Sequence, residues 1–110
     1  MSEPTLTEVF GANATQTSTT ITISKADLAS VGLVAASNNT AESLLVAILL
    51  KAESVLSEPN RSLDATNRNV TVNYGGQDLV ETNNAYYRRD AYSVLMYKTT
   101  TLAAIVPGDY

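Results

Sequence analysis

The segment NNTAESLLVAILLKAESVLSEPN, residues 38–60, constrains the fold more than any other part of the sequence. Asn39 suits the N-cap of a helix, and Glu42 three residues later completes a capping box. Leucine, isoleucine, valine and alanine then recur at helical spacing and leave almost no side of the helix polar. Because helices usually end before a proline, Pro59 marks the end, and the pattern predicts one helix over residues 40–57.

A helix this apolar has to be covered on more than one side. One interpretation is a central helix wrapped by the sheet of its own chain. The other is that the sheet covers one face, and a second copy or a large partner covers the rest. The sequence favours the first slightly and leaves the second open.

Three segments alternate in the manner of strands. In TTITIS, residues 19–24, the two isoleucines point to one side and predict a half-buried strand. A second strand is predicted over NVTVNY, residues 69–74, followed by a turn at Gly75-Gly76, where a positive φ is allowed. The segment AYYRRDAYSVLMYK, residues 85–98, reads as one long strand. We therefore expect an α+β fold with one main apolar helix packed on a small, mostly antiparallel sheet.

The segments between these elements carry weaker signals. Ser24 with Asp27 fits a capping box, so one or two helical turns are expected from Lys25 to about Ser30, ended by Gly32. Residues 58–68 are expected to form a loop. Residues 77–85 form either a short return strand or part of a longer loop.

The 110 residues are expected to form a single domain. Residues 1–18 are polar and rich in threonine, and they predict an extended arm. They form either a frayed terminus or an arm that orders against another subunit through Phe10. Residues 99–110 are expected to form an extended C-terminal segment. The first 16 residues lack the charged and apolar parts of a secretory signal, so we expect synthesis in a cytoplasm.

Composition excludes several kinds of chemistry. The chain contains no histidine and no cysteine, which removes Ser-His and Cys-His nucleophile pairs, disulfides and the usual zinc sites. The net charge is −4 and the only adjacent basic pair is Arg88-Arg89, so binding to nucleic acid is not expected. The longest apolar run, Leu44–Leu50, is far shorter than the ~20 residues that cross a bilayer. No carboxylate pair has a companion group that identifies a substrate. We therefore expect no enzyme, no cofactor, no metal and no membrane partner.

Aromatic and arginine side chains concentrate in NNAYYRRDAYSVLMYK, residues 83–98. Tyrosine and arginine are enriched at the energetic centres of protein interfaces. These side chains form either such an interface or the edge of an ordinary core, and we favour the interface. The residues predicted to contact other subunits are Phe10, Tyr86, Tyr87, Arg88 and Tyr92.

Three segments together resemble small bacteriophage virion proteins, especially capsid cement (decoration) proteins. They are the arm and strand TEVFGANATQTSTTITIS, the helix AESLLVAILLKAESVL and the strand AYYRRDAYSVLMYK. The resemblance lies in the general character of the whole chain and includes no diagnostic motif. No site residue is therefore carried over from it. It implies a structural protein that binds the major capsid protein or other virion subunits and stabilises the shell. It also implies a homo-oligomer, such as a trimer, located in the virion after assembly in the host cytoplasm.

Two alternatives stay open. The first is a neck or tail connector of the same kind of particle. The second, from a different class, is a small cellular oligomeric binding module.

Overall fold

The computed structural model describes residues 2–98 and 107–109. It confirms an α+β fold with one main helix and two small antiparallel sheets. The elements along the chain are α1 (Leu6–Phe10), β1 (Thr15–Gln16), β2 (Ile21–Thr22), the 3-10 helix η1 (Lys25–Val31), α2 (Ala41–Glu53), α3 (Glu58–Leu63), β3 (Val70–Thr82), β4 (Ala85–Met96) and the 3-10 turn η2 (Pro107–Asp109).

Helix α2 is the predicted apolar helix, but it is shorter at both ends. Its N-cap is Thr40, whose hydroxyl accepts a hydrogen bond from the Ser43 amide at 3.1 Å. The predicted cap, Asn39, is used instead by the preceding loop, because its side chain binds the amide of Ala36 and the carbonyl of Val34. Asn39 and Thr40 are both polar and adjacent in the sequence. The preceding loop uses the side chain of Asn39, and Thr40 caps the helix.

The expected loop over residues 58–68 is wrong over its first half, which forms α3. The Ser57 hydroxyl caps this helix by accepting from the Asn60 amide, and Pro59 lies in its first turn. Proline fits that position because the first amides of a helix need no partner within it. Pro59 therefore lies at the start of a second helix, whereas the first helix already ends at Glu53.

Strands β3 and β4 form one long antiparallel hairpin. The long strand predicted over residues 85–98 is confirmed for Ala85–Met96. The turn predicted at Gly75-Gly76 is wrong: both glycines lie inside β3, where the register shifts between Tyr74 and Gly76 to form a bulge. The chain reverses instead at Asn83 and Asn84, with φ angles of 51° and 66°.

The N-terminal region is less extended than expected. Residues 6–10 form α1, which is closed by a reciprocal capping box between Thr5 and Glu8. The strand predicted over residues 19–24 is confirmed only for Ile21–Thr22, which form β2 and pair with β1. The predicted half burial is wrong for these two residues, which are exposed, although Ile23 just after them packs on the Leu28 cluster. The turns predicted from Lys25 are confirmed as η1, ended by Gly32 at φ 100°. Ser24 makes no capping bond; Asp27 instead binds the backbone and side-chain amides of Asn13.

The buried side chains gather on two sides of α2. One cluster joins Val9 of α1, Ala52 of α2 and Val72 of β3. The other joins η1 and the segment that follows it to α2, through Leu28, Leu33 and Ala47. A 2.7 Å backbone hydrogen bond from the Val72 amide to the Leu56 carbonyl ties the base of the hairpin to the link between α2 and α3.

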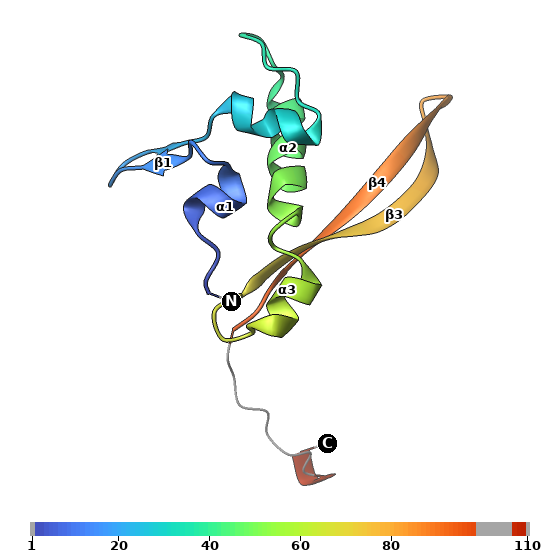
Figure 1. Cartoon of the computed structure of the whole chain (residues 1–110). Helices are drawn as coiled ribbons and strands as arrows, with labels where there is room; N and C mark the ends of the chain where they lie inside the picture. Colours follow the sequence, from blue (N-terminus) through green and yellow to red (C-terminus); the bar gives the residue numbers. More distant parts are fainter. Residues whose placement is uncertain (1, 99–106, 110) are drawn as a thin grey trace.

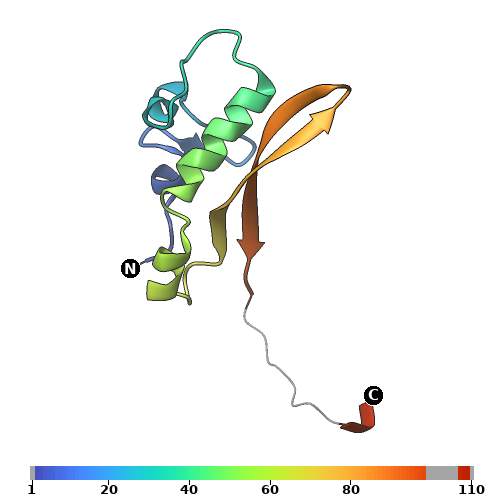
Figure 2. The ribbon, with the colours of Figure 1, turned by 90° about the vertical axis from the view of Figure 1, so that its right-hand side faces the viewer.

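From this base the hairpin runs away from the helices and ends at a free turn (Figures 1 and 2). The extended segment expected over residues 99–110 lies outside the described residues, apart from η2 at 107–109.

Candidate protein–protein interaction surface

The hairpin is packed at its base and exposed beyond it. At the base Thr71 and Val72 are buried, whereas from Tyr74 to Ala91 every residue except Val80 is exposed. The helices contact the first residues of β3. On the other side of the hairpin, Tyr92 and Tyr97 meet the rest of the chain, whereas Val94, Leu95 and Met96 are exposed. The register places even-numbered residues of β4 on the side where Val72 meets the α2 cluster, called here the α2 face. Odd-numbered residues of β4 lie on the opposite side, the α3 face, where Tyr97 donates to Glu58 of α3.

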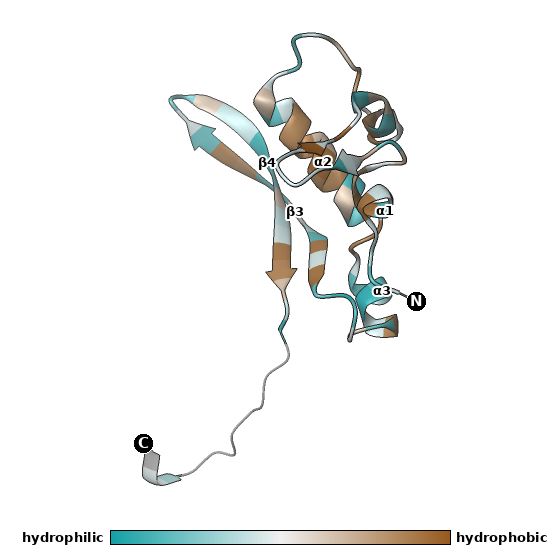
Figure 3. Cartoon of the chain, turned by 90° about the vertical axis from the view of Figure 1, so that its left-hand side faces the viewer, coloured by the Kyte–Doolittle hydropathy of each residue, from teal (hydrophilic) through white to brown (hydrophobic). Residues whose placement is uncertain are grey.

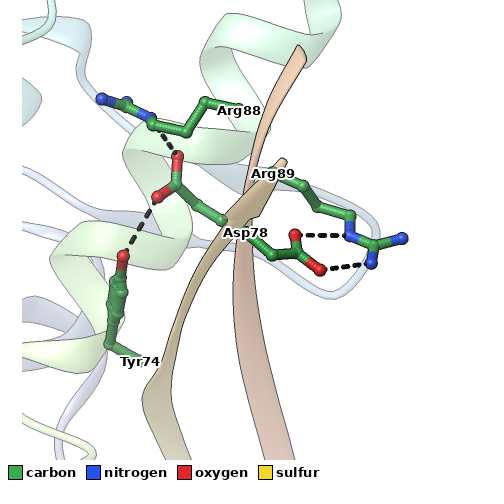
Figure 4. Close-up of polar contacts among 5 residues, drawn as sticks. Tyr74, Asp78, Arg88 and Arg89 are labelled. Carbon is green, nitrogen blue, oxygen red and sulfur yellow. Dashed lines mark hydrogen bonds and ion pairs between the residues drawn. The ribbon is translucent and has the colours of Figure 1, made fainter. Parts of the chain in front are cut away.

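A connected polar network lies on the α2 face. The Tyr74 and Tyr92 rings lie opposite each other, with centroids 5.3 Å apart and planes tilted by 54°. The Tyr74 hydroxyl donates to Asp90 Oδ1 at 3.0 Å, and Arg88 Nε donates to Asp90 Oδ2 at 3.2 Å (Figure 4). Desolvation and then the bond to Asp90 raise the pKa of Tyr74. Desolvation and then the charge of Glu53 raise the pKa of Tyr92. In both cases the shift favours the protonated, neutral hydroxyl.

An ion pair lies on the α3 face. Arg89 binds Asp78 across the hairpin with two parallel contacts, one of them Nε to Oδ1 at 2.9 Å (Figure 4). The bond to Arg89 lowers the pKa of Asp78, and the same bond raises that of Arg89. Since both side chains are more than half exposed, the pair contributes little to stability and mainly fixes the register. Tyr87 lies on this face, opposite Val80.

The five residues predicted to contact other subunits divide into two groups. Tyr86, Tyr87 and Arg88 lie on the free part of the hairpin, with Tyr86 76% and Tyr87 56% exposed. Phe10 and Tyr92 are half-buried and pack on the Val9, Ala52 and Val72 cluster of their own chain. The structure thus brings Phe10 close to the base of the hairpin, but not to its exposed tip.

Helix α2 leaves an apolar stripe uncovered on the same molecule. Leu45 is 58% and Val46 is 55% exposed, and the brown stretch of α2 in Figure 3 shows how apolar the helix is. A hollow of about 470 Å³ lies beside this stripe, lined by Val46, Leu49 and Leu50 of α2 and by Asp90 and Tyr92 of β4. The interpretation of a helix fully wrapped by its own sheet is therefore wrong for this part of α2.

Sequence reasoning missed two members of this surface. Leu79, which is 75% exposed, lies opposite Arg88, and Tyr74 joins the network on the α2 face. The sequence left residues 77–85 open as either a short return strand or part of a longer loop, after a turn at Gly75-Gly76. In the structure Leu79 belongs to β3 itself, which continues through both glycines to Thr82.

This surface carries side-chain types that bind other proteins. Among residues 2–98 and 107–109, no group of three or more acidic side chains is placed to hold a metal ion. Nor does any helix in that part of the chain have the length and apolar character needed to cross a membrane. The exposed groups are tyrosine rings, aliphatic side chains and oriented guanidinium groups, which bind through buried area and directed hydrogen bonds.

Comparison with models of known protein families, with curated protein sequences and with solved structures finds no match to this chain.

Proposed function

We propose that the chain is a structural subunit that acts by binding other protein chains, as a cement protein on the shell of a bacteriophage capsid. The observation that carries the proposal is the hairpin β3–β4, which extends beyond its helices with tyrosine and arginine side chains on both faces. A two-stranded hairpin is marginally stable in water without a covering layer, so this one is best explained as a part that is completed by a partner.

The exposed stripe of α2 supports the same proposal. Val46 adds exposed apolar area beside Asp90 and Tyr92 of the hairpin, and Leu45 is exposed on the same helix. Exposed apolar patches on soluble chains mark interaction sites. In a shell, many copies bind at once, so that modest affinity at each contact gives firm attachment. The assignment to a phage capsid rests on the sequence resemblance alone.

The test is the location of the chain in particles. Virus particles are induced from the organism that encodes the chain, purified, and labelled with gold-conjugated antibody raised against the recombinant protein. Label spread over the shell supports a cement protein, whereas label at one vertex or on the tail supports a connector. If the chain is expressed in the culture but the purified particles carry no label, the virion assignment is refuted.

A further inference from the structure

We propose that the outer edge of β4 pairs with the same edge of a second copy, antiparallel and centred on Arg89, to give a four-stranded sheet across a two-fold axis. The inference deepens the proposed function and rests on its premise that the hairpin is a binding surface. It names the occupant of that surface as another copy of this chain.

The first step is that the edge of β4 is open. The edge of β3 is already used at its base, where the Val72 amide donates outward to Leu56. Within residues 2–98 and 107–109, no strand pairs with the outer edge of β4. An open edge carries backbone donors and acceptors in a row and is a ready template for another strand.

The second step identifies the residues of β4 whose backbone groups point outward, away from β3. Val72 donates its amide away from β4 and pairs with Val94. Because outward and inward groups alternate along an antiparallel strand, the outward backbone groups of β4 belong to its even-numbered residues. The side chains of these residues are those of the α2 face, chiefly Tyr86, Arg88, Asp90 and Tyr92.

The third step is that these side chains are complementary to themselves in one register. With Arg89 on the two-fold axis, Arg88 lies opposite Asp90 of the second copy, and Tyr86 opposite its Tyr92. Each pair occurs twice by symmetry. A two-fold axis at Arg88 or at Asp90 would place that residue opposite its own copy and leave the Arg88–Asp90 pairs unmade. With the axis at Arg89, the residues that meet their own copies are the two arginines at position 89, which lie on the α3 face and are each paired with Asp78 of their own hairpin. In the register centred on Arg89, the outward backbone groups of the even-numbered residues in one copy face those of the other copy. About eight backbone hydrogen bonds form between them.

The fourth step is the hollow beside β4. Its wall is formed by Val46, Leu49 and Leu50 on α2 and by Asp90 and Tyr92 on β4. In the proposed register the second copy's Tyr86 comes directly opposite Tyr92, and therefore next to this hollow. A tyrosine ring that is 76% exposed in the single chain thus gains an apolar site, and α2 gains part of the cover that it lacks.

The register can be tested because the chain has no cysteine of its own. Three single-cysteine variants are compared under mild oxidation: Arg89→Cys, Tyr87→Cys and Ala91→Cys. Across the axis two copies of position 89 have Cα atoms about 4.5 Å apart, which suits a disulfide, whereas two copies of position 87 or 91 lie about 14 Å apart. We expect a covalent dimer from the first variant alone. A mixture of the other two should also cross-link, because 87 of one copy faces 91 of the other.

The charges give a second test, read by sedimentation equilibrium of the isolated protein. Arg88→Asp should raise the dissociation constant of the dimer by about tenfold or more, and adding Asp90→Arg to it should restore the dimer. The matched control is Lys98→Asp, which makes the same change of charge at an exposed residue beyond the end of β4, and it should leave the dimer formed. A native chain that stays monomeric at about 100 μM, or forms a closed trimer, would overturn the inference, as would equal cross-linking at all three positions. None of these results involves capsids, so this inference and the virion assignment can fail separately.

Discussion

At the scale of single residues, Tyr87 and Tyr92 allow the same substitution to be compared at an exposed and at a half-buried position. They lie in the same strand, but Tyr87 is exposed on the α3 face, whereas Tyr92 packs on the cluster of Val9, Ala52 and Val72. We predict that Tyr87→Ala leaves the melting temperature of the isolated chain nearly unchanged and weakens attachment to a shell or other partner. Interface tyrosines typically cost about 2 kcal/mol or more of binding free energy when truncated.

The control is the same substitution five residues further along. Tyr92→Ala should lower the free energy of unfolding by about 2 kcal/mol, because it removes half-buried ring area from a small core. Thermal unfolding followed by circular dichroism measures both variants. If Tyr87→Ala unfolds several degrees earlier and still attaches normally, Tyr87 belongs to the edge of the core and not to an interface.

The raised pKa values of Tyr74 and Tyr92 lead us to predict that the folded chain loses stability in alkaline solution. Desolvation raises the pKa of both, helped by Asp90 at Tyr74 and by Glu53 at Tyr92. The folded chain therefore holds these protons more tightly than the unfolded chain. The contribution is complete below the unfolded pKa of about 10, and is lost as the pH rises through the folded values.

Urea unfolding at a series of alkaline pH values measures this effect. The double variant Y74F/Y92F should show a flatter dependence of the free energy of unfolding on pH than the native chain, because phenylalanine has no proton to lose. An identical slope in the two proteins would mean that neither hydroxyl is linked to folding.

At the scale of elements, the free part of the hairpin depends on its turn. Asn83 and Asn84 both have positive φ, the backbone of a two-residue hairpin turn, in which asparagine followed by glycine is preferred. We predict that Asn84→Gly slows amide hydrogen exchange between residues 77 and 90, and that Asn84→Val accelerates it. Valine is branched at Cβ and is strained at positive φ.

Mass spectrometry of exchanged peptides measures this change, with α2 as the internal control. Exchange in α2 should be the same in all three proteins, because its hydrogen bonds do not depend on the turn. A hairpin that exchanges as slowly as α2 in the monomeric native chain would contradict the marginal stability inferred for it.

The long elements could be predicted because their patterns repeat. The apolar period of α2 and the alternation in β4 each extend over a dozen residues, so a misplaced cap shifts an end without changing the element. The turn could not be predicted, since Gly75-Gly76 and Asn83-Asn84 both allow positive φ. The choice between them depends on the pairing of Tyr74 with Tyr92 and of Thr82 with Ala85, which is a property of the folded hairpin.

The interaction surface was predictable in residue type but not in extent. Tyrosine and arginine content pointed to Tyr86, Tyr87 and Arg88, and all three are exposed. Alternation says which side chains share a face, but not how far the helices cover that face. For this reason the sequence could not separate Tyr92, which is half-buried, from Tyr86. It also gave no sign that Phe10 packs on its own core.

At the scale of the whole molecule, the described part of the chain leaves large apolar side chains uncovered in two places, the free part of the hairpin and the stripe on α2. Leu79 and Tyr86 of the hairpin are 75% and 76% exposed, and Leu45 of α2 is 58% exposed. Both uncovered areas are reduced when two hairpins join side by side, since each copy covers the edge and the hollow of the other.

This coupling between surface and assembly gives the last prediction. If the native chain pairs through β4, its melting temperature rises with protein concentration, because dilution favours the dissociated and less stable chain. With an unfolding enthalpy of about 70 kcal/mol per copy, a tenfold increase in concentration should raise the melting temperature by about 3–4 °C. Differential scanning calorimetry over a hundredfold range of concentration measures the slope. Arg88→Asp should lower the melting temperature and flatten the slope at the dilute end, where the weakened dimer dissociates, and the double exchange R88D/D90R should restore the native behaviour. A native melting temperature that is independent of concentration, with the protein shown to be monomeric throughout, would mean that the exposed edge is reserved for a different partner.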